Sequence, residues 1–354
     1  MTPSVTRRDF VRNATLAAAG AAASFYLPRI APAGVAPPEE VKKTRSYNEK
    51  MEYRRLGKTG LWISAVALGG HWKRVNTAIP RGTALEKNRE EILRYCLSVG
   101  INYVDACTNT EVRTYGQIVK NFRDKIYFGY SCAQTEPREA AWRTADALTR
   151  SLEEGLKSAG VDYVDVWRIT MHDRGSKHTD DEADEMAKAL DRARKAGKTR
   201  VGGFSSHDRP WIQKNIEKYP DAVQVVLFPY TAASKELPQE SLFDAVRKLD
   251  VGVLGIKPFA SNSLFKGDSS PDSPHREDDD QRARLAIRYI LSNPAITAPI
   301  PGLISTAQVD NMVAAIKERR ELDAAEKAQL RRDADRAMAN LPPNYQWLRD
   351  WEYV

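Results

Sequence analysis

The chain has 354 residues, with 54 lysines and arginines against 47 aspartates and glutamates, a formal net charge of +7 and three cysteines. At 42% hydrophobic content it can bury the core of one domain of catalytic size. Basic and acidic residues alternate along most of the sequence, so we expect no nucleic-acid partner. The few cysteines, without CxxC spacing, exclude a disulfide scaffold and a zinc or cluster motif.

The first 33 residues are typical of an export signal. Arg7 and Arg8 precede Phe10, an Ala-rich apolar run and small residues up to Ala33. This order predicts a cleavable signal, and the paired arginines favour the twin-arginine pathway, whose machinery becomes an expected partner. We therefore expect a periplasmic or extracytoplasmic mature protein. A membrane anchor is the alternative, but Arg29 interrupts the apolar run before the ~20 residues that a membrane span requires.

Composition also predicts where the folded part begins and ends. Residues 34–50 are rich in Pro and charge without apolar periodicity, which predicts a linker, so the folded domain is expected over 51–340. Residues 341–354 form an aromatic tail that either packs on the domain or helps to wall a substrate pocket. Its aromatic residues are Tyr345, Trp347, Trp351 and Tyr353.

Eight short β-rich runs alternate with helical patterns from residue 65 onward. The helical period is clearest over 144–160, where apolar residues recur at three- and four-residue steps until Gly160. Strand and helix alternating eight times predict an α/β fold, a closed (β/α)8 TIM barrel with its active site at the C-terminal ends of the strands. The predicted strands are 65–70, 102–106, 125–131, 162–170, 200–206, 223–228, 252–259 and 296–302.

Several segments resemble the aldo-keto reductases, in the family's order and spacing. They are MEYRRLGKTGLWISAVALGG, GINYVDACTNTEV, LEEGLKSAGVDYVDVW, RKAGKTRVGGFSSHD and AIRYILSNPAITAPIPGLISTAQVDNMVAAI. The resemblance extends from Met51 to about Lys327. It implies an N-terminal β-hairpin before the barrel, a nicotinamide cofactor (NAD or NADP) and an oxidoreductase that acts on carbonyl compounds.

The resemblance implies a catalytic tetrad that this sequence keeps only in part. In the family a tyrosine donates the proton, a lysine paired with an aspartate lowers the pKa of that tyrosine, and a histidine orients the carbonyl. Asp105 matches the aspartate. Thr110, Ser131 and Thr170 occupy the positions of the tyrosine, lysine and histidine. Without the lysine a tyrosine keeps a pKa of about 10, and loss of general acid catalysis costs ~10²- to 10⁴-fold in rate.

Tyr115 and His172 are the residues that the sequence offers instead. Tyr115 precedes a glycine, as in the family, but aligns with a helix, and His172 follows Thr170 by two residues. With Asp105 they form the candidate catalytic set. An acid–base site of His172 and Asp105 would then act on a sugar or another carbonyl compound.

A metal site is the other chemistry considered. His71, His172 and His207 follow predicted strands, and with Asp105 or Cys107 they would suit a divalent metal. No short ligand-spaced motif supports this alternative, so we expect no metal. Cys107 also lies near Cys132 on the neighbouring predicted strand, where the two form either one disulfide or two free thiols.

The resemblance assigns the cofactor-binding positions. The nicotinamide amide would be bound after the fifth strand and on the sixth, the pyrophosphate by a lysine, and the adenosine end by the loop after the last strand. That loop has no arginine, so it does not favour NADP over NAD. The matching residues are Ser205, Ser206, Gln224, Lys257, Gly302, Ser305, Gln308 and Asn311.

Three functions remain open from the sequence. The first is an exported oxidoreductase with a non-standard tetrad and a tightly retained cofactor, acting on a polar carbonyl or carbohydrate. The second is a barrel enzyme of another class, such as a lyase or isomerase, with or without a metal. The third is a catalytically inactive binding protein. Dinucleotide binding separates the first from the third.

Overall fold

A computed structural model describes residues 39–70, 83–172, 175–234, 241–268, 273–318 and 320–349. These residues belong to one compact unit, Ala36–Val354. The predicted signal segment, His71 and the last five residues of the tail lie outside the described residues.

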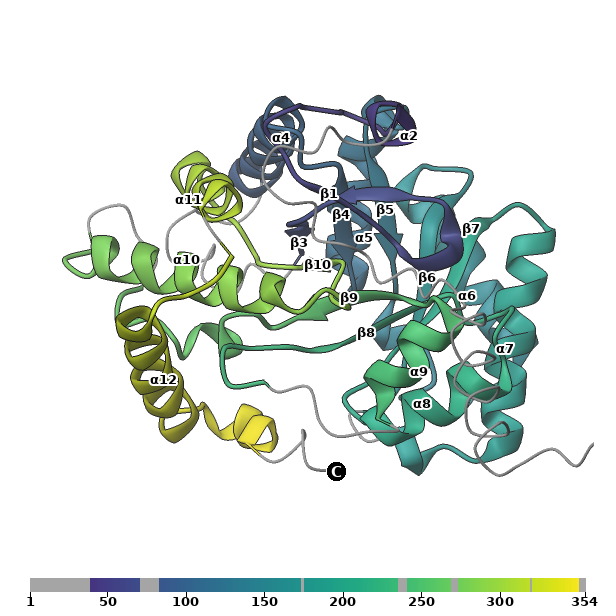
Figure 1. Cartoon of the computed structure of the whole chain (residues 1–354). Helices are drawn as coiled ribbons and strands as arrows, with labels where there is room; N and C mark the ends of the chain where they lie inside the picture. Colours follow the sequence, from purple (N-terminus) through teal and green to yellow (C-terminus); the bar gives the residue numbers. More distant parts are fainter. Residues whose placement is uncertain are drawn as a thin grey trace, which may run out of the picture. The chain divides into compact units, whose positions relative to one another are not determined.

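Eight parallel strands form the barrel wall (Figure 1). They lie side by side in chain order from β3 to β10. The first and last strands are joined where the amides of Ala67 and Gly69 donate to the carbonyls of Pro299 (3.0 Å) and Pro301 (2.7 Å). The predicted fold is confirmed. The strands are β3 (Leu68–Gly69), β4 (Tyr103–Ala106), β5 (Tyr127–Tyr130), β6 (Val164–Thr170), β7 (Thr199–Ser205), β8 (Val225–Pro229), β9 (Gly252–Ile256) and β10 (Ala298–Pro299).

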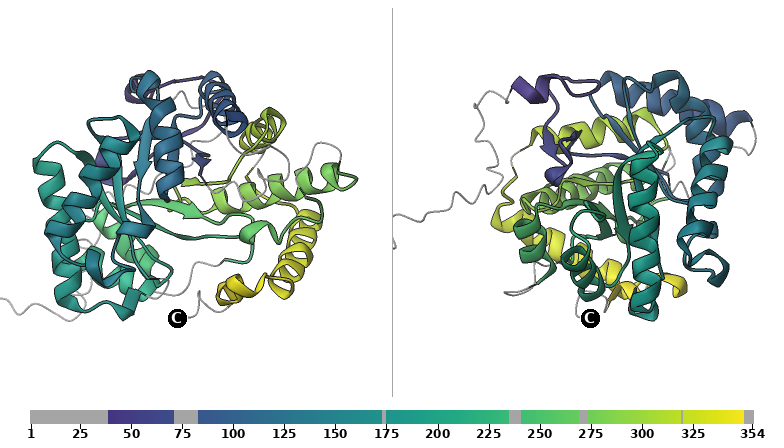
Figure 2. Two further views of the ribbon diagram at one scale, coloured as in Figure 1. Left: turned by 180° about the vertical axis from the view of Figure 1, so that it is seen from behind. Right: turned by 90° about the vertical axis from the view of Figure 1, so that its right-hand side faces the viewer.

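Helices surround this wall (Figure 2). The helix predicted over 144–160 is α6, where the Thr144 side chain caps the N-terminus and Gly160 ends the helix with a φ of 70°. The helices after α2 (Glu39–Lys42) are α4 (Thr83–Ser98), α5 (Asn109–Val119), α6 (Ala145–Ala159), α7 (Asp180–Lys195), α8 (Arg209–Lys218), α9 (Leu242–Leu249), α10 (Arg276–Ser292), α11 (Thr306–Lys317) and α12 (Ala324–Ala339).

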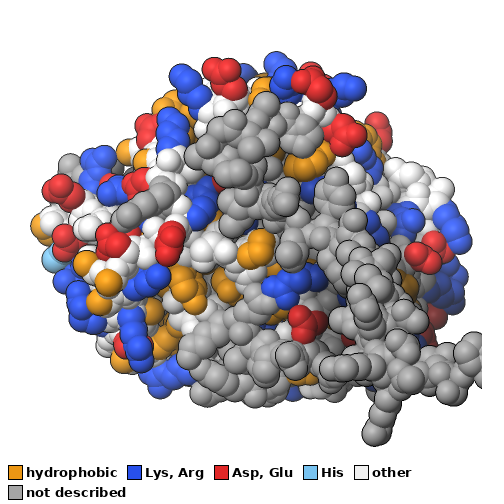
Figure 3. All heavy atoms as spheres, in the orientation of Figure 1, with side chains coloured by type: hydrophobic (Ala, Val, Ile, Leu, Met, Phe, Trp, Pro, Cys, Tyr) orange, Lys and Arg blue, Asp and Glu red, His pale blue; other side chains and the backbone are white. Residues whose placement is uncertain are grey.

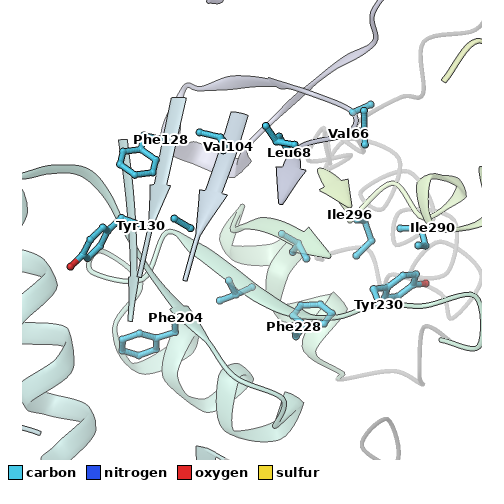
Figure 4. Close-up of a cluster of buried hydrophobic side chains, with 14 of the residues drawn as sticks. Val66, Leu68, Val104, Phe128, Tyr130, Phe204, Phe228, Tyr230, Ile290 and Ile296 are labelled. Carbon is cyan, nitrogen blue, oxygen red and sulfur yellow. The ribbon is translucent and has the colours of Figure 1, made fainter. Parts of the chain in front are cut away.

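Two layers of apolar side chains hold the barrel together. The larger lies between the wall and the helices and includes Phe128, Phe204 and Phe228 (Figure 4). The smaller fills the inside, because every second strand residue points inward. A hairpin of β1 (Tyr53–Arg55) and β2 (Trp62–Ser64) supplies three apolar side chains to that inner layer. The hairpin therefore closes the N-terminal end of the barrel and leaves the C-terminal end for a site.

Residues 39–50 are part of the fold, although composition predicted a linker there. Val41 is buried, and Arg45 pairs with the buried Asp165 of β6 (2.8 Å). Asp165 also binds Arg123 (2.9 Å) and Arg200 (3.1 Å), so three guanidinium groups surround one carboxylate. The folded part therefore begins before the predicted start at Met51, because a charged side chain ties the segment to the wall.

The surface mixes charges of both signs. Lys and Arg side chains are interspersed with Asp and Glu on the face shown in Figure 3. No helix in the described part of the chain is both long and apolar enough to span a bilayer.

Candidate active site

A buried ion pair lies inside the barrel near the C-terminal ends of the strands. Asp105 is the last inward-pointing residue of β4. Arg168 points inward from β6 because it stands two residues after Val166, which belongs to the inner apolar layer. The Arg168 guanidinium donates to both oxygens of Asp105, at 2.5 and 3.2 Å. Gly129 of β5, the strand between them, makes room for the Tyr103 hydroxyl and the Asp105 carboxylate, since a Cβ there would lie 2.0 Å from the first and 2.8 Å from the second. Asp105 thus has a cationic partner, but it is an arginine and comes from β6.

Hydroxyl groups extend this pair across the barrel. Arg168 Nη1 donates to Thr170 Oγ1 (2.9 Å), and Thr170 Oγ1 lies 2.6 Å from Ser131 Oγ. Ser131 in turn bonds Glu136 Oε2 at 2.5 Å. A continuous chain of hydrogen bonds therefore runs from Asp105 to Glu136. We call these five residues the polar chain. Ser131 and Thr170, which the resemblance places at the positions of the family's lysine and histidine, are both members of it.

The charges of the polar chain are set by burial and by their partners. Burial alone would lower the pKa of Arg168, but the charge and hydrogen bonds of Asp105 raise it above its usual value. Arg168 is therefore a permanent cation. Burial raises the pKa of Glu136, against hydrogen bonds from Ser131 and the backbone that lower it. Glu136 is 1% exposed, and it also accepts from the Thr170 amide (2.8 Å) and Trp167 Nε1 (3.3 Å).

His172 belongs to a different cluster. Its Nε2 lies 3.2 Å from Arg143 Nη2, and its ring stacks on His178 at 4.9 Å. His178 Nδ1 lies 3.0 Å from Glu182, and burial lowers the pKa of His178. His172 is therefore not a member of the polar chain, in which Asp105 pairs with Arg168 and not with the predicted His172.

Tyr115 is buried in the layer between the wall and α5. Its hydroxyl donates to the Gly69 carbonyl (3.1 Å) and lies 3.4 Å from Arg89 Nη1. Burial raises its pKa to about 12, which makes it a weak acid at neutral pH. These contacts give Tyr115 a packing role and do not support the prediction of a proton donor.

The cysteines are free thiols. Cys107 and Cys132 are both unbridged, so the disulfide alternative is not the one found. Burial raises the pKa of both thiols, which disfavours a reactive thiolate. In the described residues no group of three or more His, Cys, Asp or Glu side chains is placed to hold a metal ion.

Part of the predicted cofactor set gathers at the strand ends. Ser205 ends β7, and the Ser206 hydroxyl lies 3.5 Å from the His172 carbonyl. Lys257 follows β9 with a φ of 56°, an uncommon conformation for a residue with a side chain. Gly302 follows β10, the strand that pairs with β9, so Lys257 and Gly302 leave adjacent strands.

The other predicted cofactor residues are engaged elsewhere. Ser305 caps α11 by accepting from the Gln308 amide, and Gln308 Oε1 accepts from Ile304 (2.8 Å). Asn311 binds α10 through Arg284 (2.7 Å) and the Asp280 carbonyl (2.9 Å). These three side chains order the first turns of α11 and bring its N-terminus beside Gly302.

Gln224 is not at the mouth. It precedes β8, where its amide donates to the Gly202 carbonyl, so it lies toward the N-terminal end of the wall. Gln224 stands three positions before Leu227, the partner of Ser205, so its binding to the nicotinamide together with Ser205 and Ser206 stays a prediction.

The described part of the aromatic tail, residues 341–349, lies at the C-terminal ends of the strands. Trp347, in the short helix Pro343–Arg349, stacks on His207 after β7 with ring centroids 4.0 Å apart. Lys257 Nζ lies 5.6 Å from the Trp347 ring and 5.9 Å from that of Tyr345. Residues 341–349 therefore pack against the strand ends that carry the predicted cofactor residues. The same contact would place their aromatic rings beside a substrate pocket at these strand ends.

Sequence reasoning missed Arg168 and Glu136. An arginine among the apolar residues of a buried strand that also carries Asp165 was a visible signal, since a charge on an inward position requires a partner. Glu136 lies in an irregular loop after β5, with no local pattern to mark it.

Comparisons with known proteins agree on one family. The model of the aldo/keto reductase family matches residues 66–284. L-galactose dehydrogenase of Arabidopsis thaliana is 25% identical over 296 residues, 76% of this chain and 89% of the relative. L-glyceraldehyde 3-phosphate reductase of Escherichia coli O157:H7 is 24% identical over 322 residues, and the match covers 75% of this chain and 88% of the relative. An aldo-keto reductase from Bacillus halodurans in its holo form has a TM-score of 0.60 at 21% identity, covering 80% of this chain and 96% of its own.

Proposed function

Because the chain belongs to the aldo/keto reductase family of oxidoreductases, we propose that it exchanges hydride between a nicotinamide cofactor and a polar carbonyl or carbohydrate. The observation that carries the proposal is the Asp105–Arg168 pair under the mouth, with the Thr170 hydroxyl bonded to Arg168. Hydroxyl and guanidinium donors beside a strand end suit a substrate oxygen. Two relatives whose names specify galactose and glyceraldehyde 3-phosphate support a polyhydroxylated substrate.

The residues at the mouth fit a dinucleotide. Lys257 supplies a positive charge on one strand end, and the N-terminus of α11 adjoins the next, so both favour the pyrophosphate anion. The uncommon backbone conformation of Lys257 is typical of a ligand site. Ser205 and Ser206 would face the nicotinamide amide. When bound, the cofactor would supply or accept the hydride.

The cofactor proposal predicts that dinucleotide is bound and that Lys257 contributes to it. Purified protein should release NAD(H) or NADP(H) on denaturation, as measured by mass spectrometry and absorbance. Lys257→Ala should weaken dinucleotide binding by about 10- to 100-fold, since a hydrogen bond to a charged group contributes ~1.5–3 kcal/mol. Lys188→Ala, on the exposed side of α7, is the matched control and should bind as the parent does. The proposal is wrong if no dinucleotide is released and none binds at millimolar concentration.

We also propose that the protein is exported through the twin-arginine pathway before it acts. The support is the order of residues around Arg7 and Arg8. An exported enzyme would carry its cofactor with it, and a substrate that is oxidised and reduced in one cycle would need no external supply.

Export can be tested in a host that has the pathway. Arg7→Lys with Arg8→Lys should leave uncleaved precursor in the cytoplasm, whereas Arg12→Lys should be exported normally. Cell fractionation and the N-terminal sequence of the processed chain are the measurements. Equal export of both variants would contradict the proposal.

A further inference from the structure

The polar chain ends in a buried carboxyl group that the family tetrad does not contain. Glu136 is 1% exposed and joins Thr170 through the Ser131 hydroxyl, with oxygen–oxygen distances of 2.5 and 2.6 Å. Such short distances suit proton transfer between neighbouring oxygens. We infer that Glu136, Ser131 and Thr170 form a proton relay to the substrate oxygen, with Glu136 as the positioning residue that holds the proton. The inference rests on the proposed function.

Arg168 makes the relay directional. A guanidinium has only donors, so the Thr170 hydroxyl accepts from Arg168 and cannot donate to it. If Glu136 is protonated, it donates to Ser131, Ser131 donates to Thr170, and the remaining hydrogen of Thr170 points to the substrate. If Glu136 is ionised, Ser131 donates to it, Thr170 donates to Ser131, and Thr170 can accept from a substrate alcohol. The protonation of Glu136 therefore selects the direction of the hydroxyl groups.

The relay balances the reaction in both directions. In reduction, a bound dihydronicotinamide would supply the hydride to the carbonyl carbon and be oxidised, and the carbonyl oxygen would gain the proton of Thr170. Thr170 then takes the proton of Ser131, and Ser131 takes that of Glu136, which is left ionised until water reprotonates it. In oxidation, each of these bonds forms and breaks in reverse, and Glu136 ends protonated.

Glu136 is the carboxyl group at the end of the relay, and burial raises its pKa. Arg168 stays cationic, and burial raises the pKa of Tyr130 and Cys132, which also face Glu136, so both stay neutral. The titration of Glu136 is therefore expected above the ordinary value of a glutamate. Reduction should fall, and oxidation rise, as the pH increases through that pKa.

The test removes the carboxyl group and then each hydroxyl. Glu136→Gln should lower turnover by ~10²- to 10⁴-fold, the usual contribution of general acid catalysis, and abolish the Glu136 limb of the pH profile. Ser131→Ala and Thr170→Val should do the same, while Ser131→Thr and Thr170→Ser, which keep the hydroxyl, should restore most of the rate. Glu139→Gln, exposed and three residues further on, is the matched control.

A second measurement does not depend on activity. Infrared difference spectra during a pH titration should show the band of a protonated carboxyl group at pH values above the ordinary pKa of a glutamate in the parent and in Glu139→Gln. Glu136→Gln should show no such band. If the parent turns over and Glu136→Gln keeps the same pH profile, the relay is overturned and the proposed function stands. The same holds if Thr170→Val and Thr170→Ser lose turnover equally. A parent that binds no dinucleotide would overturn the proposed function, and the infrared result would still decide whether Glu136 holds the proton.

Discussion

Replacing Asp105 with asparagine is expected to lower the free energy of unfolding by about 3–5 kcal/mol, the typical cost of leaving one member of a buried ion pair without its partner. The side chains of Asp105 and Arg168 are only 7% and 3% exposed, so water cannot replace the missing charge. Asparagine keeps the size of the side chain, but it removes the charge and replaces one accepting oxygen with an NH2 group that cannot accept from Arg168. Urea unfolding followed by circular dichroism measures the loss of stability.

A double-mutant cycle shows whether the effect comes from the pair. Arg168→Met alone should also destabilise the protein strongly, because it leaves Asp105 buried and unpaired. The double variant should lose ~0.5–3 kcal/mol less than the sum of the two single changes, since it leaves neither charge behind. Additive losses, or a change within about 0.5 kcal/mol for Asp105→Asn, would show that the pair does not hold the barrel interior.

The second large effect is expected at Asp165, which lies on the outer side of β6, the strand of Arg168. Asp165→Asn removes the charge shared by Arg45, Arg123 and Arg200, and its side chain has no exposed surface. The expected loss is again about 3–5 kcal/mol. Residues 39–50 should also become sensitive to proteolysis, because Arg45 is their ionic tie to the wall.

Two controls make the Asp165 result specific. Asp162→Asn changes an exposed carboxylate three residues earlier and should alter stability by no more than about 0.5 kcal/mol. Arg45→Ala should cost less than Asp165→Asn, since Arg123 and Arg200 still neutralise Asp165. If Arg45→Ala leaves proteolysis of residues 39–50 unchanged, the segment is held by apolar packing such as that of Val41.

The barrel could be predicted from the sequence because its signals are local. Gly160 ends α6 and Thr144 begins it through contacts a few residues away, and strands that alternate with helices imply parallel neighbours. The tie between Arg45 and Asp165 spans 120 residues, so composition alone suggested a linker where the chain is packed.

The site was harder to predict because it depends on register and on a loop. Asp105 could be proposed from the sequence because its motif is short and local. Arg168 acts only because alternation along β6 turns it inward, opposite in direction to Asp165. Glu136 reaches Ser131 through an irregular turn, and no periodic pattern determines where such a turn places a carboxyl group.

The two ends of the folded part emerge at opposite ends of the barrel. Arg45, shortly after α2, donates to the Ile126 carbonyl just before β5 begins, whereas Trp347 stacks on His207 just after β7 ends. An affinity tag joined after Val354 would therefore begin seven residues beyond Trp347, a side chain beside the proposed substrate entrance. A tag placed after the predicted cleavage site, ahead of Glu39, would leave the entrance open, and binding or kinetic constants should be compared between these two fusions before either is used as the reference enzyme.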